Sequence, residues 1–540
     1  MTGKRKREEG DLGGLLNGQN KKQLISNGLQ PHTTIQIIVG SYEKVLRGFT
    51  ATIPQELLEH QSQTPPNGHQ DDSDSLPESH QISFADTFLL SPHRSSLTCL
   101  ALSPPSSSSP KLTLATGSTD STINLYSLST TPPPRSNLPS VTNTLITPHP
   151  SNRPLGTLTH HTHPLTALTF PTSSKLLSTS LDNTLSITRT RDWTLLSSIR
   201  APIPKPRGRP SGDTLTPGDA PCGVNDAAVH PSNKLVVSVG RGERCMRLWN
   251  LVTGKKAGVL SFGREVLERV GEGKERGEGA NVVWDRKGEE FAVGFERGVG
   301  VWEVDARVRC VVRLGRGKVG RVSYVNVGGT EGRAEEEEDE VVDGEVDKVG
   351  DGEGERRGRK VLAISTEDGR VLFFDTRVET ESGNGTAKNN GDIPEARFIG
   401  QLGGTVAGIS GRIKDFKVLE PPANNTATEQ HILLLVTGSS DGAIRIWRVD
   451  PSELQLPPDN QAATTAPATG TNGTNGTKIN GDAKVANQIG NLLGTFETGN
   501  RITCLEAFVM SGVAGPIIGA AEGDGMDASE SSESDSESDD

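Results

Sequence analysis

The stretch LLLVTGSSDGAIRIWRV, Leu433–Val449, decides the fold of this chain. It contains an apolar run, a turn of small residues with an acid, and a second run in which apolar and polar residues alternate. Two short strands joined by a tight polar turn explain this pattern. The acid, Asp441, lies six residues before Trp447. The stretch therefore predicts a β-hairpin with Asp441 in its turn and Trp447 near the end of its second strand.

The same pattern occurs seven times along the chain. The hairpins are expected at 35–50, 112–128, 176–190, 235–251, 291–304, 361–376 and 433–449. Their turn acids are Glu43, Asp120, Asp182, Glu243, Glu296, Asp368 and Asp441, and the position six residues later includes Trp249, Trp302, Phe374 and Trp447. Successive acids are farther apart than the roughly 40–45 residues of a four-stranded propeller blade. Each repeat must therefore carry an insertion.

The two ends of the repeat pattern complete each other. The first hairpin lacks the short strand that precedes most of the others, and the last strand-like segment, Arg501–Phe508, lacks a hairpin. One shared blade would use both, with one strand from the C-terminal part and three from the N-terminal part, and would close a ring that has only short sheet edges. The predicted fold class is all-β, a seven-bladed β-propeller with disordered insertions and tails.

These hairpins resemble WD40 repeats. The opening IQIIVGSYEKVLRGF, the segment RLWNLVTGKKA at 247–257 and the closing RITCLEAF resemble one WD40 subfamily, the p21-activated-kinase-interacting protein 1-like family. The resemblance implies structural roles for the turn acids, which in WD40 repeats hydrogen-bond the tight turn. The family's Gly-His pair is mostly missing, and only His161 is expected at its histidine position. Fungal members act in assembly of the large ribosomal subunit, so the resemblance also implies a nuclear, nucleolar role.

We expect three parts along the chain. A disordered basic tail spans 1–34, the propeller spans 35–508, and an acidic Ser-rich tail spans 509–540. Insertions are expected near 50–74, 130–153, 200–221, 331–359, 377–393 and 451–486, because most of these segments are too polar, or too rich in Pro, Gly or charge, to bury a core.

Composition excludes several classes of protein. The chain has 540 residues, a formal net charge of -12 and 5 cysteines that form no CxxC pair. A disulfide framework and a zinc ribbon are therefore not expected, and the cysteines favour a reducing compartment. No apolar run approaches the 18 residues of a spanning helix, and no secretory signal is expected.

No catalytic residue, cofactor site or metal site is predicted. Gly315–Gly320 has the form GxGxxG, but the next residues read as a strand, whereas a dinucleotide site needs a helix there. His160, His161 and His163 have no Cys or carboxylate nearby in the sequence, and a turn between blades explains them better than a metal site. We therefore expect a non-enzymatic protein.

Three charged segments point to partners. Lys205, Arg207 and Arg209 resemble the core of an AT-hook, which suits a DNA minor groove or a phosphate-lined RNA surface, although a flexible basic linker is the alternative. The run Lys4, Arg5, Lys6 and Arg7 is a candidate nuclear signal or a disordered basic end. Candidate phosphorylation sites in the acidic tail are Ser529, Ser531, Ser532, Ser534, Ser536 and Ser538.

The functional hypothesis is a scaffold that acts in large-subunit (60S) assembly and maturation of precursor ribosomal RNA. Its expected partners are pre-ribosomal assembly proteins and precursor rRNA, without a membrane, and the chain is expected as a monomer within a larger complex. The alternative is a signalling scaffold that binds and restrains a p21-activated kinase, as the family name suggests.

Overall fold

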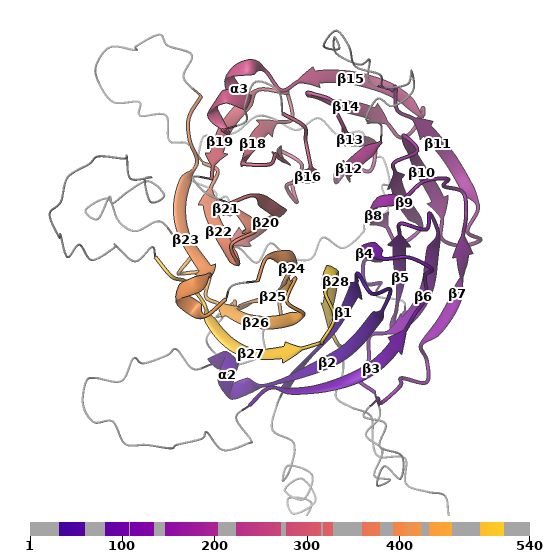
Figure 1. The fold of residues 1–540 in the computed structure, drawn as a ribbon, viewed down its shortest axis with the longest axis vertical. Helices are drawn as coiled ribbons and strands as arrows, with labels where there is room; N and C mark the ends of the chain where they lie inside the picture. The colour runs from indigo at the N-terminus through magenta and orange to yellow at the C-terminus, as the bar shows by residue number, and fades with distance from the viewer. Residues whose placement is uncertain are drawn as a thin grey trace, which may run out of the picture.

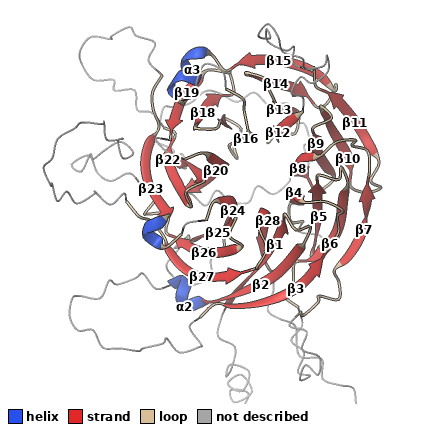
Figure 2. Cartoon of the chain, in the orientation of Figure 1, coloured by secondary structure: helices blue, strands red, loops and turns tan. Residues whose placement is uncertain are grey.

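Seven four-stranded sheets surround a central axis in the computed structural model of this chain (Figure 1). The structure describes residues 32–59, 81–106, 109–133, 146–203, 223–271, 277–314, 317–327, 359–377, 393–409, 411–422, 431–455 and 487–511. Strands and their connecting turns make up nearly all of this part of the chain (Figure 2). The molecule is a seven-bladed β-propeller, and the predicted fold class is confirmed.

Each blade has four antiparallel strands, of which the first is nearest the axis in blades 1 to 6. Blade 1 consists of β4 (Leu97–Leu102), β5 (Lys111–Ser118), β6 (Ile123–Ser129) and β7 (Arg153–Leu158). Blade 2 consists of β8 (Leu165–Thr172), β9 (Lys175–Ser180), β10 (Thr184–Arg189) and β11 (Leu195–Arg200). Blade 3 consists of β12 (Val224–Val229), β13 (Leu235–Gly240), β14 (Cys245–Asn250) and β15 (Lys255–Ser261). Blade 4 consists of β16 (Asn281–Trp284), β17 (Glu290–Gly294), β18 (Gly298–Glu303) and β19 (Val308–Arg313). Blade 5 consists of β20 (Val319–Val327), β21 (Arg359–Thr366), β22 (Arg370–Asp375) and β23 (Arg397–Gly403). Blade 6 consists of β24 (Ile413–Leu419), β25 (Leu433–Ser439), β26 (Ala443–Val449) and β27 (Asn491–Glu497). The sequence pattern had not indicated the outer strand β15.

Blade 7 is built from segments far apart in the chain. Its strand order is β28-β1-β2-β3, with bounds β28 (Ile502–Val509), β1 (His32–Ser41), β2 (Leu46–Pro54) and β3 (Ser83–Leu90). β28 pairs antiparallel with β1, from Ile35 opposite Val509 to Ser41 opposite Ile502. This is the shared blade that the incomplete first and last repeats predict, and it closes the ring.

The hydrophobic core lies between neighbouring blades. Phe373 of blade 5 packs in one cluster with Phe416 and Trp447 of blade 6, and all three are buried. Leu434 of blade 6 shares another cluster with Ile37 and Leu505 of blade 7. Full burial of a side chain of this size contributes about 1.5–3 kcal/mol. Each blade is therefore stabilised from two sides, and removing one exposes two interfaces.

A belt of hydrogen bonds links the blades near the central axis. Thr503 Oγ1 donates to the carbonyl oxygen of Leu97 at 2.8 Å, which joins blade 7 to blade 1. Further links are Thr166 Oγ1 to Val224 O at 2.7 Å, Asn225 Nδ2 to Gly279 O at 2.9 Å, Asn281 Nδ2 to Gly320 O at 2.9 Å, and Leu505 N to Asp415 Oδ2 at 3.0 Å. These bonds satisfy polar groups that packing of the blades removes from water.

The two faces of the ring differ in their connections. We call the top face the side that carries the turns between the second and third strands of each blade, such as Asp120 between β5 and β6. The bottom face carries the first-to-second and third-to-fourth connections. The first residue of β1, His32, and the last residue of β28, Val509, both lie at the bottom face. The described residues on either side of 60–80, 134–145, 328–358, 378–392, 423–430 and 456–486 are also at the bottom.

Three bottom connections return along the outer strand of the preceding blade before they enter the next outer strand. Parallel bridges join Asp86 to Ile146, Val311 to Glu395 and Gln401 to Gln488. Thr147 N donates to Asp86 O at 2.8 Å in the first of these. Such pairing covers part of an outer edge that would otherwise present unpaired backbone groups.

Several expected boundaries are wrong by a few residues. The expected insertion at 50–74 begins too early, because β2 continues to Pro54 and helix α2 (Gln55–Glu59) follows it. The ring begins at His32 and ends at Val509. The other helices among the described residues are α3 (Arg264–Arg269) and the 3-10 helix η2 (Thr405–Ala407). Within the described residues, no helix has the length and apolar character needed to cross a membrane.

The connection between β26 and β27 gives a test of these boundaries. Replacing 456–486 by a short Gly-Ser linker should leave the unfolding midpoint in urea unchanged, because loop length has only a small entropic effect. A deletion that begins at Pro451 also removes Leu454, whose side chain is 0% exposed. That larger deletion should cost about 2–5 kcal/mol, as for other buried leucines. Equal stability of the two variants would contradict this boundary.

Candidate functional site

The top-face turns of blades 1 and 2 contain the same histidine–aspartate arrangement. In blade 2, Asp182 Oδ2 lies 3.0 Å from His161 Nδ1 and accepts from Thr162 N at 3.1 Å, while Oδ1 accepts from Thr184 N at 2.9 Å. His161 Nε2 lies 2.8 Å from Ser178 Oγ on the second strand. The aspartate thus binds its own turn and holds the histidine against the blade.

Blade 1 repeats this arrangement with His93. Asp120 Oδ2 accepts from Arg94 N at 2.9 Å and lies 3.3 Å from His93 Nδ1, and His93 Nε2 lies 2.8 Å from Thr116 Oγ1. The expectation that only His161 occupies this position is therefore wrong. His93 and His161 each precede an innermost strand by four residues, at Leu97 and Leu165. Counting from the strand would have found His93, whereas counting from the acid misses it because the β4–β5 connection is longer.

Burial and hydrogen bonding shift the pKa values of the acidic and histidine side chains in these turns. Burial alone would raise the pKa of Asp182, but bonds from His161, Thr184 and the backbone of Thr162 outweigh it and lower that pKa well below its usual range. Burial lowers the pKa of His93, although Asp120 opposes the shift. His160, beside His161, has its pKa lowered to about 4 by burial and by the neighbouring imidazole.

The lowered pKa of His160 predicts an acid-sensitive ring. An unfolded chain binds a proton at His160 below its ordinary pKa of 6.5, whereas the folded ring does not until about pH 4. The stabilising contribution is therefore present above pH 6.5 and is lost as the pH falls through this window. These two pKa values give a fall in the free energy of unfolding of about 2 kcal/mol between pH 7 and pH 5. Partial exposure of the imidazole to solvent reduces the expected fall to about 1 kcal/mol. Urea titrations at both values should show a smaller fall in His160→Gln, and an identical fall would refute the assignment.

Blades 3 and 6 contain a different set of polar contacts. Trp249 Nε1 donates to Ser238 Oγ at 2.8 Å, and Trp447 Nε1 donates to Thr437 Oγ1 at 3.3 Å. Their turn acids pair with an arginine four residues later, Glu243 with Arg247 and Asp441 with Arg445.

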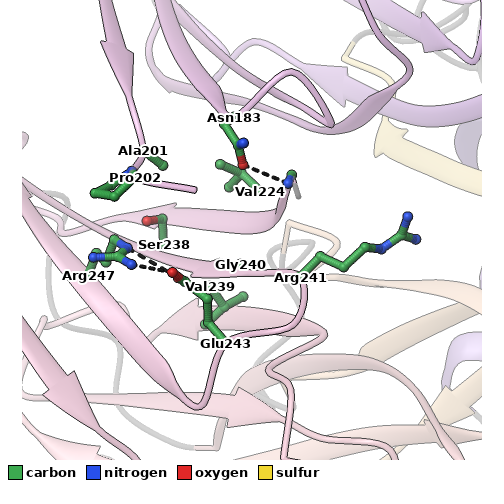
Figure 3. A pocket seen from close by; sticks show the side chains of 11 residues that line it. Asn183, Ala201, Pro202, Val224, Ser238, Val239, Gly240, Arg241, Glu243 and Arg247 are labelled. Carbon is green, nitrogen blue, oxygen red and sulfur yellow. Dashed lines mark hydrogen bonds and ion pairs between the residues drawn. The ribbon is translucent and has the colours of Figure 1, made fainter. Parts of the chain in front are cut away.

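Figure 3 shows the Glu243 turn at the boundary of blades 2 and 3. Glu243 and Arg247 face each other there, and Arg241 points away from them. Asn183 Oδ1 accepts from Gly223 N at 2.6 Å across the same boundary. The small cavity between them has room for little more than one water molecule, about 10 Å³. The turn therefore belongs to the interface between blades, with no space for a larger ligand.

The remaining turn acids bind nearby groups in other ways. Glu43 Oε2 accepts from Arg501 N at 3.0 Å, Glu296 pairs with Lys318 at 2.6 Å, and Asp368 pairs with Arg370. All four predicted aromatics, Trp249, Trp302, Phe374 and Trp447, are buried. The structure thus places the acids in turns and the aromatics between blades, and it does not bring them together into one reactive site.

The innermost strands carry charges that pair across blade boundaries. Lys417 of blade 6 lies 2.9 Å from Glu506 of blade 7, and Arg321 of blade 5 lies 3.8 Å from Asp415 of blade 6. Lys417 and Glu506 also line a bottom-face cavity of about 830 Å³. Apolar side chains such as Leu419 and Val509 line the same cavity.

The described cysteines and histidines do not form a reactive centre. Burial raises the pKa of Cys99 and of Cys310 to about 12, which leaves both as unreactive thiols. Among the described residues, no group of three or more His, Cys, Asp or Glu side chains could hold a metal ion. The turn between β7 and β8 contains His160, His161 and His163, and its contacts are those of a structural turn. Gly317–Gly320 leads into strand β20, as expected for this part of the GxGxxG match.

Three predicted interaction segments lie outside the described residues. They are the basic run Lys205, Arg207 and Arg209, the run Lys4 to Arg7, and the serines from Ser529 to Ser538. The first lies in the sequence between Ile203 and Gly223, which are on the top face. The described residues next to the other long gaps in the described ranges are on the bottom face.

Comparison with known proteins agrees with this architecture. Residues 85–127 and 152–188 match the family described as WD40, "WD domain, G-beta repeat". The chain is 24% identical to Protein MAK11 of Saccharomyces cerevisiae over 436 residues, which are 77% of this chain and 78% of that protein. It is 25% identical over 272 residues to "p21-activated protein kinase-interacting protein 1-like" of Danio rerio, and 21% identical over 481 residues to the Xenopus laevis protein of the same name. The match to the Danio rerio protein covers 50% of this chain and 51% of that protein, so the chain spans about half of that relative's length. The match to the Xenopus laevis protein covers 89% of this chain and 84% of that protein.

Proposed function

We propose that this WD40-repeat propeller is a non-enzymatic scaffold in the nucleus and nucleolus that acts in assembly of the 60S ribosomal subunit and maturation of its precursor RNA. The observation that carries the proposal is the match to Protein MAK11, a fungal relative, over 77% of this chain. The subfamily resemblance implies large-subunit assembly for fungal members. The candidate partners are pre-ribosomal assembly proteins and precursor rRNA.

The closed ring supports a scaffold mechanism. Its blades are fixed by cores on both sides, so the described turns on the top and bottom faces keep constant positions relative to one another. Several modest contacts to different components then act together, because each bound contact raises the effective concentration of the next. The charge pairs between blades and the raised pKa values of the Cys99 and Cys310 thiols support a non-enzymatic role.

The segments outside the described residues complete this proposal. Lys4, Arg5, Lys6 and Arg7 would direct the chain to the nucleus. Lys205, Arg207 and Arg209 would contact nucleic acid, and phosphorylation from Ser529 to Ser538 would deepen the charge of the acidic tail.

The alternative function is a scaffold that binds and restrains a p21-activated kinase. The names of the Danio rerio and Xenopus laevis relatives favour it. Binding between the purified chain and such a kinase would support this alternative, and failure of the purified pair to bind would exclude it.

Sedimentation of the tagged protein from nuclear extract, with and without ribonuclease, tests the main proposal. Migration with large-subunit precursor RNA, which collapses after ribonuclease, is the expected result. Migration as a small, ribonuclease-insensitive complex that contains a kinase would replace the main proposal by the alternative.

A further inference from the structure

Five residues with cationic or aromatic side chains gather on the top face where blades 6 and 7 meet. We call this set the Tyr42 patch: Tyr42, Lys44, Arg412, Lys414 and Arg501. Tyr42 and Lys44 belong to the turn between β1 and β2, and Arg501 immediately precedes β28. Arg412 and Lys414 are at the start of β24, the innermost strand next to β28 (Figure 1).

Two contacts join Tyr42 and Arg501 within the patch. Tyr42 N donates to Arg501 O at 2.9 Å, and the Arg501 guanidinium lies over the Tyr42 ring, 5.8 Å from its centre. The tyrosine nevertheless remains 61% exposed. A flat aromatic ring beside an arginine is a platform on which an unpaired base can stack.

The positive charges of the patch are only partly neutralised. Arg412 pairs with Glu367 at 3.2 Å, and Glu43 accepts from the backbone of Arg501. Within the described part of the chain, Lys414 makes no ion pair or hydrogen bond, and the Arg501 guanidinium has no carboxylate partner. Burial lowers the pKa of Lys414, and the positive charges of Arg412 and Arg501 lower it further. Like charges at this proximity disfavour one another, and an anion would relieve that repulsion.

The backbone of the first turn adds an independent observation. Lys44 follows its turn acid with φ 69, in the left-handed region. At the matching position after the acid, blades 1, 2, 5 and 6 have Ser121, Asn183, Gly369 and Gly442, all with positive φ. A residue with a Cβ is disfavoured there relative to Gly, and Asn tolerates the conformation better than Lys does. Blade 7 thus presents a lysine at a position that the backbone favours for small residues.

We propose that the Tyr42 patch binds a single-stranded RNA segment, with its cations on successive phosphates and the Tyr42 ring against a base. A combination of cations with an exposed aromatic ring fits RNA better than an acidic peptide, which offers charge but no base to stack. The inference rests on the proposed function for the source of the RNA, a ribosomal RNA precursor.

Fluorescence anisotropy with purified full-length protein tests this proposal. The probe is a labelled oligouridine of about twelve nucleotides, within the range that such binding surfaces cover. The double variant Lys414→Gln and Arg501→Gln should weaken binding roughly tenfold and reduce the slope of log K against log salt by about 1.4, since two phosphate contacts are lost. Tyr42→Ser should weaken binding roughly tenfold with little change in the salt slope.

A matched control removes the same amount of charge elsewhere. Lys255 and Lys256 are exposed on the outer strand β15, and their double change to Gln should leave affinity and slope unchanged. A third variant, with Lys205, Arg207 and Arg209 changed to Gln, separates the basic segment from the patch. Unchanged thermal transitions show that each variant folds.

The outcomes distinguish this proposal from its rivals. Three results would overturn the proposal. They are an equal loss of RNA affinity in the patch and control variants, a loss of affinity only in the 205–209 variant, and an absence of RNA binding by the unaltered protein. Tighter binding of an oligoglutamate peptide that ignores Tyr42→Ser would reassign the patch to an acidic protein partner. Co-sedimentation with precursor RNA by the patch variant would leave the proposed function intact, whereas RNA binding in vitro without co-sedimentation would leave the patch but remove that function.

Discussion

Truncation of the chain after Asn500 should abolish cooperative folding of the whole propeller. The truncation removes β28, which pairs with β1 and supplies the buried side chains of Ile502, Cys504, Leu505 and Ala507. Burial of Ile502 and Leu505 alone contributes about 3–6 kcal/mol. A folded protein has a net stability of only about 5–15 kcal/mol, so this loss, with the pairing to β1, consumes most of it. Calorimetry should show no sharp transition.

The control for this prediction is a truncation after Ser511. It removes the acidic tail and keeps β28 and the bond from Ser511 N to Thr130 O. Its transition should coincide with that of the full chain. A cooperative transition in the shorter protein, with six blades intact, would show that the ring does not depend on its shared blade.

Replacement of Trp447 by alanine should have the next largest effect. The indole is 3% exposed in the cluster between blades 5 and 6, and its Nε1 donates to Thr437. Loss of a buried tryptophan costs about 3–5 kcal/mol through lost burial and the cavity that remains. Urea denaturation should therefore show a clearly lower midpoint.

Trp447→Phe separates packing from hydrogen bonding. It keeps most of the ring volume and loses only the bond to Thr437, which contributes about 1 kcal/mol. We expect a small loss of stability in this variant. An alanine variant as stable as the phenylalanine variant would contradict the buried position.

Local patterns predicted the fold well because each hairpin has a recognisable sequence pattern of its own. The turn acid and the alternating strand after it lie within a few residues, as at Asp441 and Trp447, so no distant information is needed. Closure was predictable by subtraction, since Arg501–Phe508 lacked a hairpin and Ile35 lacked a preceding strand. Both inferences depend on spacing alone.

Contacts between blades left weaker signals in the sequence. Asn281 bonds to Gly320, and Thr503 to Leu97, but neither pair has a spacing that marks it. The return segments at Ile146 and Gln488 pair with strands of another blade after long connections, so no local pattern predicts their register. The Tyr42 patch was missed for the same reason, because Tyr42 and Arg501 come together only after the ring has closed.

The shared blade also shapes the life of the nascent chain. β1 emerges from the ribosome first, and its partner β28 emerges more than four hundred residues later. At about 5–20 residues per second, the wait is roughly half a minute to a minute and a half. Throughout that time β1 presents a bare strand edge and apolar side chains in a crowded solution, where such edges promote aggregation. Translation speed and chaperone supply should therefore determine how much of this protein reaches its native form.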